Sequence, residues 1–294
     1  MSASPPPLFL IGAAKAGTTT LARRLGALPA FRLSDPKEPE FFSHDANFAQ
    51  GLARYAECFA GARPDQVLLD ASTAYTRSPQ HPLAAGRIHA HRPDARLVYL
   101  LRHPVDRAYS HFVHRHTKEL HPGRDFDRDF EAHVATDPMC VDSSDYHLQI
   151  QAYLAHFPRE ALLVLFTHDL DADPVAVVRT VCAFAGVPDA GAEELSEGRE
   201  NVASEFLESR VRMRLTGRVR RLPGARTLLA ALPRPLKERV YGALRSSPLG
   251  RGARAGLTPP PLSPEARARL LARYEPCTRF VEEFTGRALP EWRR

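Results

Sequence analysis

The stretch from Leu8 to Leu21 constrains the fold more than any other part of the chain. Its first four residues are apolar and have the pattern of a strand buried in a parallel sheet. Gly12 and Gly17 bracket a tight loop, and three threonines follow at the start of a helix. Unpaired N–H groups and the helix dipole both favour an anion at such a start. With Lys15 inside the loop, this segment predicts a site for a phosphate or an anion of similar shape.

The loop departs from the nucleotide-hydrolase pattern G-x-x-x-x-G-K-[ST] in the position of its lysine. The two glycines have the required spacing, but Thr18 stands where that pattern has lysine, and Lys15 lies in the middle of the loop. A simple strand-to-helix turn with a solvated lysine would explain the same residues. The loop alone therefore leaves a structural turn and an anion site equally open, and the rest of the chain has to decide.

Three further apolar runs predict strands, at Val67–Ser72, Arg96–Leu101 and Ala161–Phe166. Helical patterns occur between and after them, over Thr18–Leu28, Pro82–His91, Tyr146–His156, Pro174–Ala185 and Pro264–Thr285. Strands that alternate with helices form a parallel sheet with helices on both faces. We therefore expect an α/β fold, a P-loop-like three-layer sandwich in which helices flank a central parallel sheet.

Two other segments place charged side chains next to strand ends. The segment Lys37–Phe42 reads Lys-Glu-Pro-Glu-Phe-Phe, and prolines before and within it impose an extended, non-helical path. It follows the first helix, so we expect it near the carboxyl edge of the sheet, where open α/β sheets bind ligands. Arg102 follows a predicted strand, and Ser110 lies further along the next helix. Because a guanidinium can hold a phosphate through two N–H bonds, this pair predicts a second anion pocket.

The 294-residue chain has a formal net charge of +6, which favours an anionic ligand or surface. We expect a single domain over residues 1–294 that contains a basic helical insert or lid at residues 205–262. The residues from Arg210 to Arg254 include thirteen arginines or lysines and one acid, Glu238. We favour a solvated basic face for this segment. A lid over an anionic cofactor and a peripheral contact with a membrane are the alternatives.

Cysteine usage and the N-terminus suggest a compartment. The four cysteines are far apart and include no C-x-x-C pair, which argues against a metal site and favours reduced thiols in the core. The N-terminal residues lack a basic region, the apolar run after them is too short for a signal peptide, and no window approaches a membrane span. We therefore expect a cytoplasmic protein.

The three motifs, in this order, resemble those of sulfotransferases that use 3′-phosphoadenosine 5′-phosphosulfate (PAPS), especially the bacterial and heparan-sulfate-type branch. They are the loop Gly12–Thr20, the segment Lys37–Phe42 and the sequence R-x-P-x-x-R-x-x-S from Arg102 to Ser110. The resemblance implies that Arg102 and Ser110 hold the 3′-phosphate and that no metal is required. It further implies that the 5′-phosphosulfate is cradled by Lys15, Ala16, Gly17, Thr18, Thr19 and Thr20.

In such a transfer the acceptor hydroxyl or amine must lose a proton as it attacks. The resemblance places the base at Glu38, and a partly desolvated cleft would raise the pKa of its carboxyl group. Glu40 is a rival that would point the same way in an extended segment, and histidines such as His44 keep a third option open. Lys15 would stabilise the charge that develops on the bridging oxygen of the leaving group.

Several questions stay open at this point. The acceptor is a small molecule, a glycan or a lipid-linked molecule. Heparan-type enzymes carry a lysine where this chain has Ala71, which argues against a polyanionic sugar. Lys37 is either a contact to the donor or acceptor or a plain surface lysine.

Two functions of other classes compete with this interpretation. A P-loop kinase or nucleotide hydrolase would need the lysine directly after Gly17, where this chain has threonine. A non-catalytic basic binding module would use the segment at 205–262. That segment lacks the interleaved aromatic side chains typical of nucleic-acid binding, so we expect no nucleic-acid partner.

Overall fold

The computed structural model describes residues 5–116, 129–194, 242–243, 247–248 and 259–294. The chain divides into two compact units. The first comprises Met1–His111, Val134–Glu197 and Ser263–Arg294, and the second comprises Phe112–His133 and Gly198–Leu262. Of the predicted basic insert at 205–262, only residues 242–243, 247–248 and 259–262 are among the described residues. The prediction of one domain with such an insert therefore stays a prediction.

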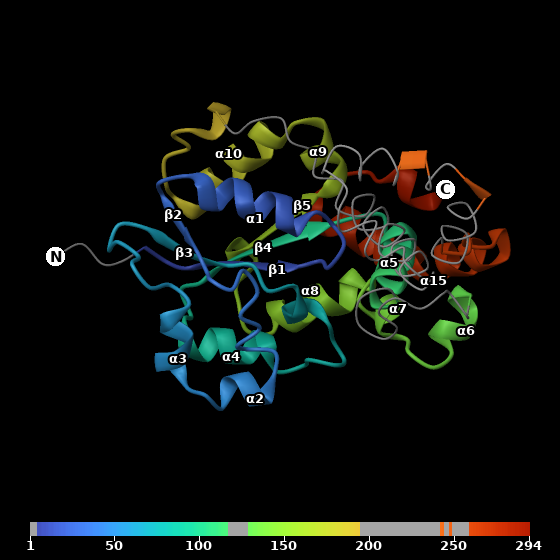
Figure 1. Cartoon of the computed structure of the whole chain (residues 1–294), viewed down its shortest axis with the longest axis horizontal. Coiled ribbons are helices and arrows are strands. Elements are labelled where there is room, and N and C mark those ends of the chain that lie inside the picture. The colour runs from blue at the N-terminus through green and yellow to red at the C-terminus, as the bar shows by residue number, and fades with distance from the viewer. Residues whose placement is uncertain (1–4, 117–128, 195–241, 244–246, 249–258) are drawn as a thin grey trace, which may run out of the picture. The chain divides into compact units, whose positions relative to one another are not determined.

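A five-stranded sheet forms the centre of the first unit (Figure 1). Across the sheet its strands are β2 (Phe31–Leu33), β3 (Val67–Asp70), β1 (Leu8–Gly12), β4 (Arg96–Leu101) and β5 (Leu162–Phe166). Every neighbouring pair is parallel. The central strand β1 is buried along its whole length, as its unbroken apolar sequence predicted. Four of these strands confirm the sequence analysis.

Strand β2 was not predicted, because no apolar run between the first helix and the segment Lys37–Phe42 indicated a strand. The three residues of β2 pair with β3 from Phe31 opposite Val67 to Leu33 opposite Leu69. So short a strand shows no clear alternation of apolar and polar residues. Only its neighbour in the sheet distinguishes it from an extended loop.

Helices cover both faces of this sheet (Figure 1). On one face, α1 (Thr18–Ala27) packs against α10 (Pro174–Ala185), which in turn packs against α9 (Thr167–Ala172). On the other face, α4 (Ala84–His91) packs against α8 (Tyr146–Leu154), and α15 (Pro264–Thr285) also contacts α8. The fold is therefore the expected three-layer α/β sandwich with a central parallel sheet.

Further helices lie within the described residues. In that part of the chain the remaining α-helices are α2 (Asp45–Phe48), α3 (Leu52–Glu57), α5 (Pro104–His114), α6 (Phe130–Val134) and α7 (Met139–Asp142). The 3₁₀ helices of the described residues are η1 (Thr73–Thr76), η3 (Arg159–Ala161), η4 (Ala192–Glu194) and η5 (Pro290–Arg293). Within the described ranges, no helix combines the length and the apolar composition needed to span a bilayer.

Helices α10 and α15 begin and end where their sequences predict, because both carry strong caps. The side chain of Asp173 accepts a hydrogen bond from the N–H of Ala176 at 2.9 Å, and Ser263 caps α15 in the same way. Each helix has proline in its first turn and ends at a glycine in the left-handed conformation, Gly186 or Gly286. These local signals define helix ends without help from tertiary contacts.

Candidate functional site

Side chains from other parts of the chain hold the loop between β1 and α1 by hydrogen bonds to its backbone carbonyl groups. Three successive carbonyls each accept one side-chain hydrogen bond: Ala14 from Arg107 Nη1 (3.3 Å), Lys15 from Arg102 Nη1 (3.1 Å) and Ala16 from Thr167 Oγ1 (2.7 Å). In a trans peptide the C=O and N–H groups point in opposite directions. The N–H groups of Lys15 and Gly17 are therefore directed away from Arg107 and Thr167, as in a loop that presents amides to an anion.

Gly12 is required by the close approach of another side chain. The hydroxyl of Thr76 donates a hydrogen bond to the carbonyl of Ile11 at 2.9 Å, directly beside Gly12. A Cβ atom at position 12 would lie 2.1 Å from Thr76 Oγ1, and the φ angle there is +151°. Gly17, at φ +98°, caps the N-terminus of α1. Both glycines are thus needed for geometry, and the loop takes one defined path.

The start of α1 offers N–H groups to a ligand. The first backbone hydrogen bond of this helix runs from the N–H of Leu21 to the carbonyl of Gly17 at 3.1 Å. The N–H groups of Thr18, Thr19 and Thr20 therefore have no acceptor inside the helix. Thr18 is buried, whereas Thr19 and Thr20 are half-buried. This arrangement suits a phosphate or sulfate oxygen at the positive end of the helix dipole.

The carboxylate of Glu38 lies next to this helix start and is linked to it through Lys37. Glu38 Oε2 accepts hydrogen bonds from the N–H and the hydroxyl of Thr73, at 3.2 and 2.8 Å. Its other oxygen lies 2.7 Å from Lys37 Nζ, and the same ammonium donates to Thr19 Oγ1 at 3.4 Å. The structure thus brings together the segment Lys37–Phe42, the start of η1 and the first turn of α1.

The expected rise in the pKa of Glu38 is wrong. Burial does raise the pKa of this carboxyl group, but the positive charge of Lys37 and the hydrogen bonds from Lys37 and Thr73 outweigh it. The pKa of Glu38 is consequently lowered. In this state Glu38 is a carboxylate with low affinity for protons.

The expectation that Glu40 points the same way as Glu38 is also wrong. Glu40 has a φ angle of +52°, so the chain turns at this residue and the segment is not extended there. The Glu40 carboxylate lies 3.1 Å from His44 Nε2, while its N–H donates to Ser72 Oγ at 2.9 Å. The two glutamates therefore have separate partners, and the contact to Lys37 belongs to Glu38.

The buried carboxylate of Asp70 holds the segments on which these groups stand. It accepts hydrogen bonds from the hydroxyls of Tyr55 (3.0 Å) and Tyr75 (2.7 Å) and from both the N–H (3.0 Å) and the hydroxyl (2.6 Å) of Ser72. Burial raises the pKa of Asp70 to about 6 in spite of these bonds. Ser72 in turn accepts from the N–H of Glu40. This role of Asp70 was not predicted from the sequence, although an aspartate that ends an apolar strand is a visible signal.

Asp70 also bears on the kinase alternative. Hydrolases of the P-loop class hold Mg²⁺ through an aspartate at the end of a strand. Asp70 ends β3, but protein donors already occupy its buried carboxylate. These contacts suit a structural carboxylate better than a metal ligand.

Arg102 contacts the loop between β1 and α1, here called the anion loop, by donating a hydrogen bond to the Lys15 carbonyl. Its own backbone carbonyl accepts a hydrogen bond from the Tyr146 hydroxyl at 2.6 Å, which fixes the end of β4. Ser110 is half-buried on α5, and no hydrogen bond joins it to Arg102. The structure therefore connects Arg102 with the loop but leaves the predicted pair of Arg102 and Ser110 without a direct link.

Arg107 is a second residue that the sequence analysis missed. Its side chain is fully buried, and its guanidinium donates to Ser144 Oγ at 2.6 Å, to the Cys140 carbonyl and to the Ala14 carbonyl. One charged group thus ties the anion loop to the segment before α8. The available signal was an arginine on the apolar face of α5, within the same motif as Arg102.

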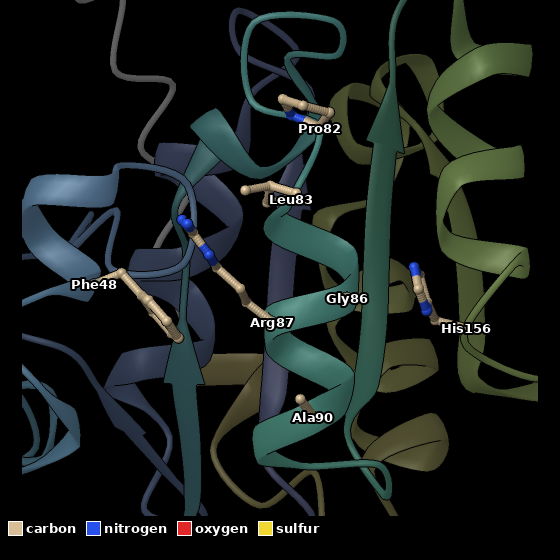
Figure 2. A pocket seen from close by; sticks show the side chains of 7 residues that line it. All are labelled: Phe48, Pro82, Leu83, Gly86, Arg87, Ala90 and His156. Atoms are coloured by element: carbon tan, nitrogen blue, oxygen red, sulfur yellow. The ribbon is translucent and has the colours of Figure 1, made fainter.

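An apolar hollow of about 300 Å³ lies beside α4, apart from these groups (Figure 2). Phe48 and Arg87 lie on one side of it and His156 on the other, while Gly86 and Ala90 of α4 leave room between them. None of the predicted site residues lines this hollow.

Comparisons with known proteins point in one direction. Residues 5–209 match the family model described as a sulfotransferase domain. The heparan sulfate glucosamine 3-O-sulfotransferase 5 of Mus musculus is 26% identical over 192 residues, which cover 62% of this chain and 54% of that protein. The bifunctional heparan sulfate N-deacetylase/N-sulfotransferase 3 of Homo sapiens is 28% identical over 202 residues, or 62% of this chain and 22% of that protein. The chain thus spans about half of the first relative and about a fifth of the second.

A solved structure is similar over nearly the whole chain. The sulfotransferase from Alicyclobacillus acidocaldarius superposes with a TM-score of 0.65 and 24% sequence identity, covering 98% of this chain and 99% of that one. At this level of identity the match establishes the fold.

Proposed function

This chain belongs to the sulfotransferase domain family, and from that premise we propose that it transfers a sulfuryl group from PAPS to a hydroxyl or amine. The observation that supports this most is the Lys37 ammonium, which lies between the Glu38 carboxylate and Thr19 at the start of α1. This contact supports the proposal, because sulfuryl transfer requires a base beside a site for the anionic donor. The acceptor is a small molecule, a glycan or a lipid-linked molecule.

The donor would be held at two places. The N–H groups at the start of α1 and the charge of Lys15 would bind the 5′-phosphosulfate, together with Ala16 and Gly17 of the loop. Arg102 would contribute its guanidinium, which already contacts the loop at the Lys15 carbonyl, and Ser110 its hydroxyl, to the 3′-phosphate. The contacts of Ala14 and Ala16 with Arg107 and Thr167 support this role, because they fix the loop before the donor arrives.

Two side chains would do the chemistry. Glu38 would take the proton from the acceptor oxygen or nitrogen as that atom attacks sulfur. The bond between sulfur and the bridging oxygen then breaks, and its electron pair stays with the leaving adenosine 3′,5′-bisphosphate. Lys15 would stabilise the negative charge that develops on that oxygen.

Calorimetric titration with adenosine 3′,5′-bisphosphate, without Mg²⁺, tests the donor site. We expect micromolar or tighter binding, about −8 kcal/mol or better, by the wild type and a sharp loss in Arg102→Ala. Exposed Arg279→Ala on α15 is the matched control and should bind like the wild type. A folded protein that binds ATP with Mg²⁺ but not this nucleotide would instead favour the kinase alternative.

A further inference from the structure

Lys37 shares one ammonium between a carboxylate and the start of α1. Its Nζ atom lies 2.7 Å from Glu38 Oε1 and 3.4 Å from Thr19 Oγ1. The shorter contact is the stronger one, because it joins opposite charges. The side chains of Lys37 and Glu38 are 22% and 30% exposed, so neither is locked in the core. The ammonium therefore has a second position within reach, toward the helix start.

We propose that Lys37 is a donor-contacting residue whose ammonium moves from Glu38 to the sulfuryl group of bound PAPS, so that donor binding frees Glu38 to act as the base. This inference rests on the proposed function, since it concerns the same site. It adds Lys37 to that site, and it states that donor binding comes before Glu38 can act as the base. The enzyme would activate its base only when there is a sulfuryl group to transfer.

The chemistry of lysine suits such a movement. An ammonium carries three donors on a flexible stem of four carbons, so it can exchange partners with little rearrangement of the backbone. The backbone of this segment is meanwhile fixed, because the N–H of Glu40 is bound to Ser72 and the side chain of Phe42 is buried. A swing of the Lys37 side chain is thus the smallest change that alters the charge around Glu38.

The movement also resolves a conflict in the ligand-free site. A carboxylate paired with an ammonium and two hydrogen-bond donors holds a proton weakly, and the pKa of Glu38 is indeed lowered. Once the ammonium neutralises the donor instead, Glu38 keeps only its two bonds to Thr73. Its affinity for the acceptor's proton then increases, and Lys37 adds positive charge where the sulfuryl group is transferred.

If Glu38 and the donor compete for one ammonium, their effects on binding must be coupled. Removing the Glu38 charge should release Lys37 and so tighten PAPS binding. This gain should require Lys37. It should also be larger for PAPS than for adenosine 3′,5′-bisphosphate, which lacks the sulfuryl group.

The test is a double-mutant cycle followed by calorimetric binding, with no acceptor present. Wild type, Glu38→Gln, Lys37→Met and the double variant are each titrated with PAPS and with adenosine 3′,5′-bisphosphate. We expect Glu38→Gln to bind PAPS about fivefold or more tightly than the wild type. We expect this gain to disappear in the Lys37→Met background and to be smaller with the bisphosphate. Glu57→Gln, which removes an exposed surface carboxylate, controls for net charge.

Equal gains in PAPS affinity from Glu38→Gln with and without Lys37 would overturn the inference. They would show simple charge repulsion between Glu38 and the donor. Unchanged PAPS affinity in Lys37→Met would overturn it as well. In both cases the bisphosphate still binds the wild type, and the proposed function stands. If the folded wild type binds neither nucleotide, the proposed function fails and this inference fails with it. Thermal melting of each variant establishes that it is folded.

Discussion

The hydroxyl of Tyr75, a residue of η1, donates a 2.7 Å hydrogen bond to the buried carboxylate of Asp70, the last residue of β3. The same carboxylate binds Ser72, and Ser72 binds the backbone of Glu40. Thr73, which holds Glu38, lies between Ser72 and Tyr75 in the chain. The buried carboxylate of Asp70 therefore positions the segments that carry and bind Glu38.

Asp70 should make stability depend on pH. Burial raises the pKa of Asp70 to about 6 in the folded protein, above its value in the unfolded chain. The folded state then binds more protons than the unfolded state between about pH 4 and pH 6. The stabilisation of the folded state by this proton binding is complete at lower pH and is lost as the pH rises through 6. Chemical denaturation should show the wild type losing stability relative to Asp70→Asn across that range, by up to about 3 kcal/mol. A constant difference would contradict the assignment.

Glu38→Gln should lower turnover sharply while leaving the donor site able to bind adenosine 3′,5′-bisphosphate. A positioned general base contributes roughly a hundredfold to ten-thousandfold to the rate, so kcat should fall by about that factor. Glu40→Gln tests the rival directly, because its carboxylate is paired with His44 and not with Lys37. The assay is sulfuryl transfer from PAPS to a panel of hydroxyl and amine acceptors. Full activity in Glu38→Gln, with loss in Glu40→Gln, would move the base to Glu40.

Lys37→Met should shift the acid limb of the pH–rate profile to higher pH. Lys37 helps to lower the pKa of Glu38, and a base works only above its pKa. Without the ammonium, burial dominates and the pKa of Glu38 rises. The profile of kcat/KM for PAPS is the quantity to measure, because it reports groups of the enzyme without bound donor, in which Lys37 contacts Glu38. An acid limb at the same pH in wild type and variant would show that Lys37 does not control this carboxylate.

Gly12→Ala should destabilise the protein and weaken donor binding together. The added Cβ would lie 2.1 Å from Thr76 Oγ1, at a φ angle of +151°. Overpacking of this kind typically costs about 1–3 kcal/mol. Gly86→Ala in α4 is the control, since its Cβ would come no closer than 3.4 Å to another atom. Denaturation and bisphosphate titration measure both effects. Wild-type stability in Gly12→Ala would mean that the loop can move away from Thr76.

Local patterns were enough to predict most of the fold. The apolar runs of β1 and β4 and the caps of α10 and α15 act over a few residues, so a linear reading detects them. Strand β2 was missed, because only its pairing with β3 distinguishes it from an extended loop. Arg107 escaped as well, since its role depends on carbonyls that lie far away in the sequence.

By itself, the sequence determined a parallel α/β sheet, a glycine loop with a lysine inside it, and carboxylates on a segment near the sheet's carboxyl edge. These follow from hydrophobic periodicity and from backbone geometry, which are local. Only the tertiary structure decided that Glu38 binds Thr73, that Glu40 turns away to His44, and that Lys37 bridges Glu38 to Thr19. The direction of the Glu38 pKa shift depends on those distant partners, because burial and a neighbouring charge act in opposite directions and only their distances decide which one prevails.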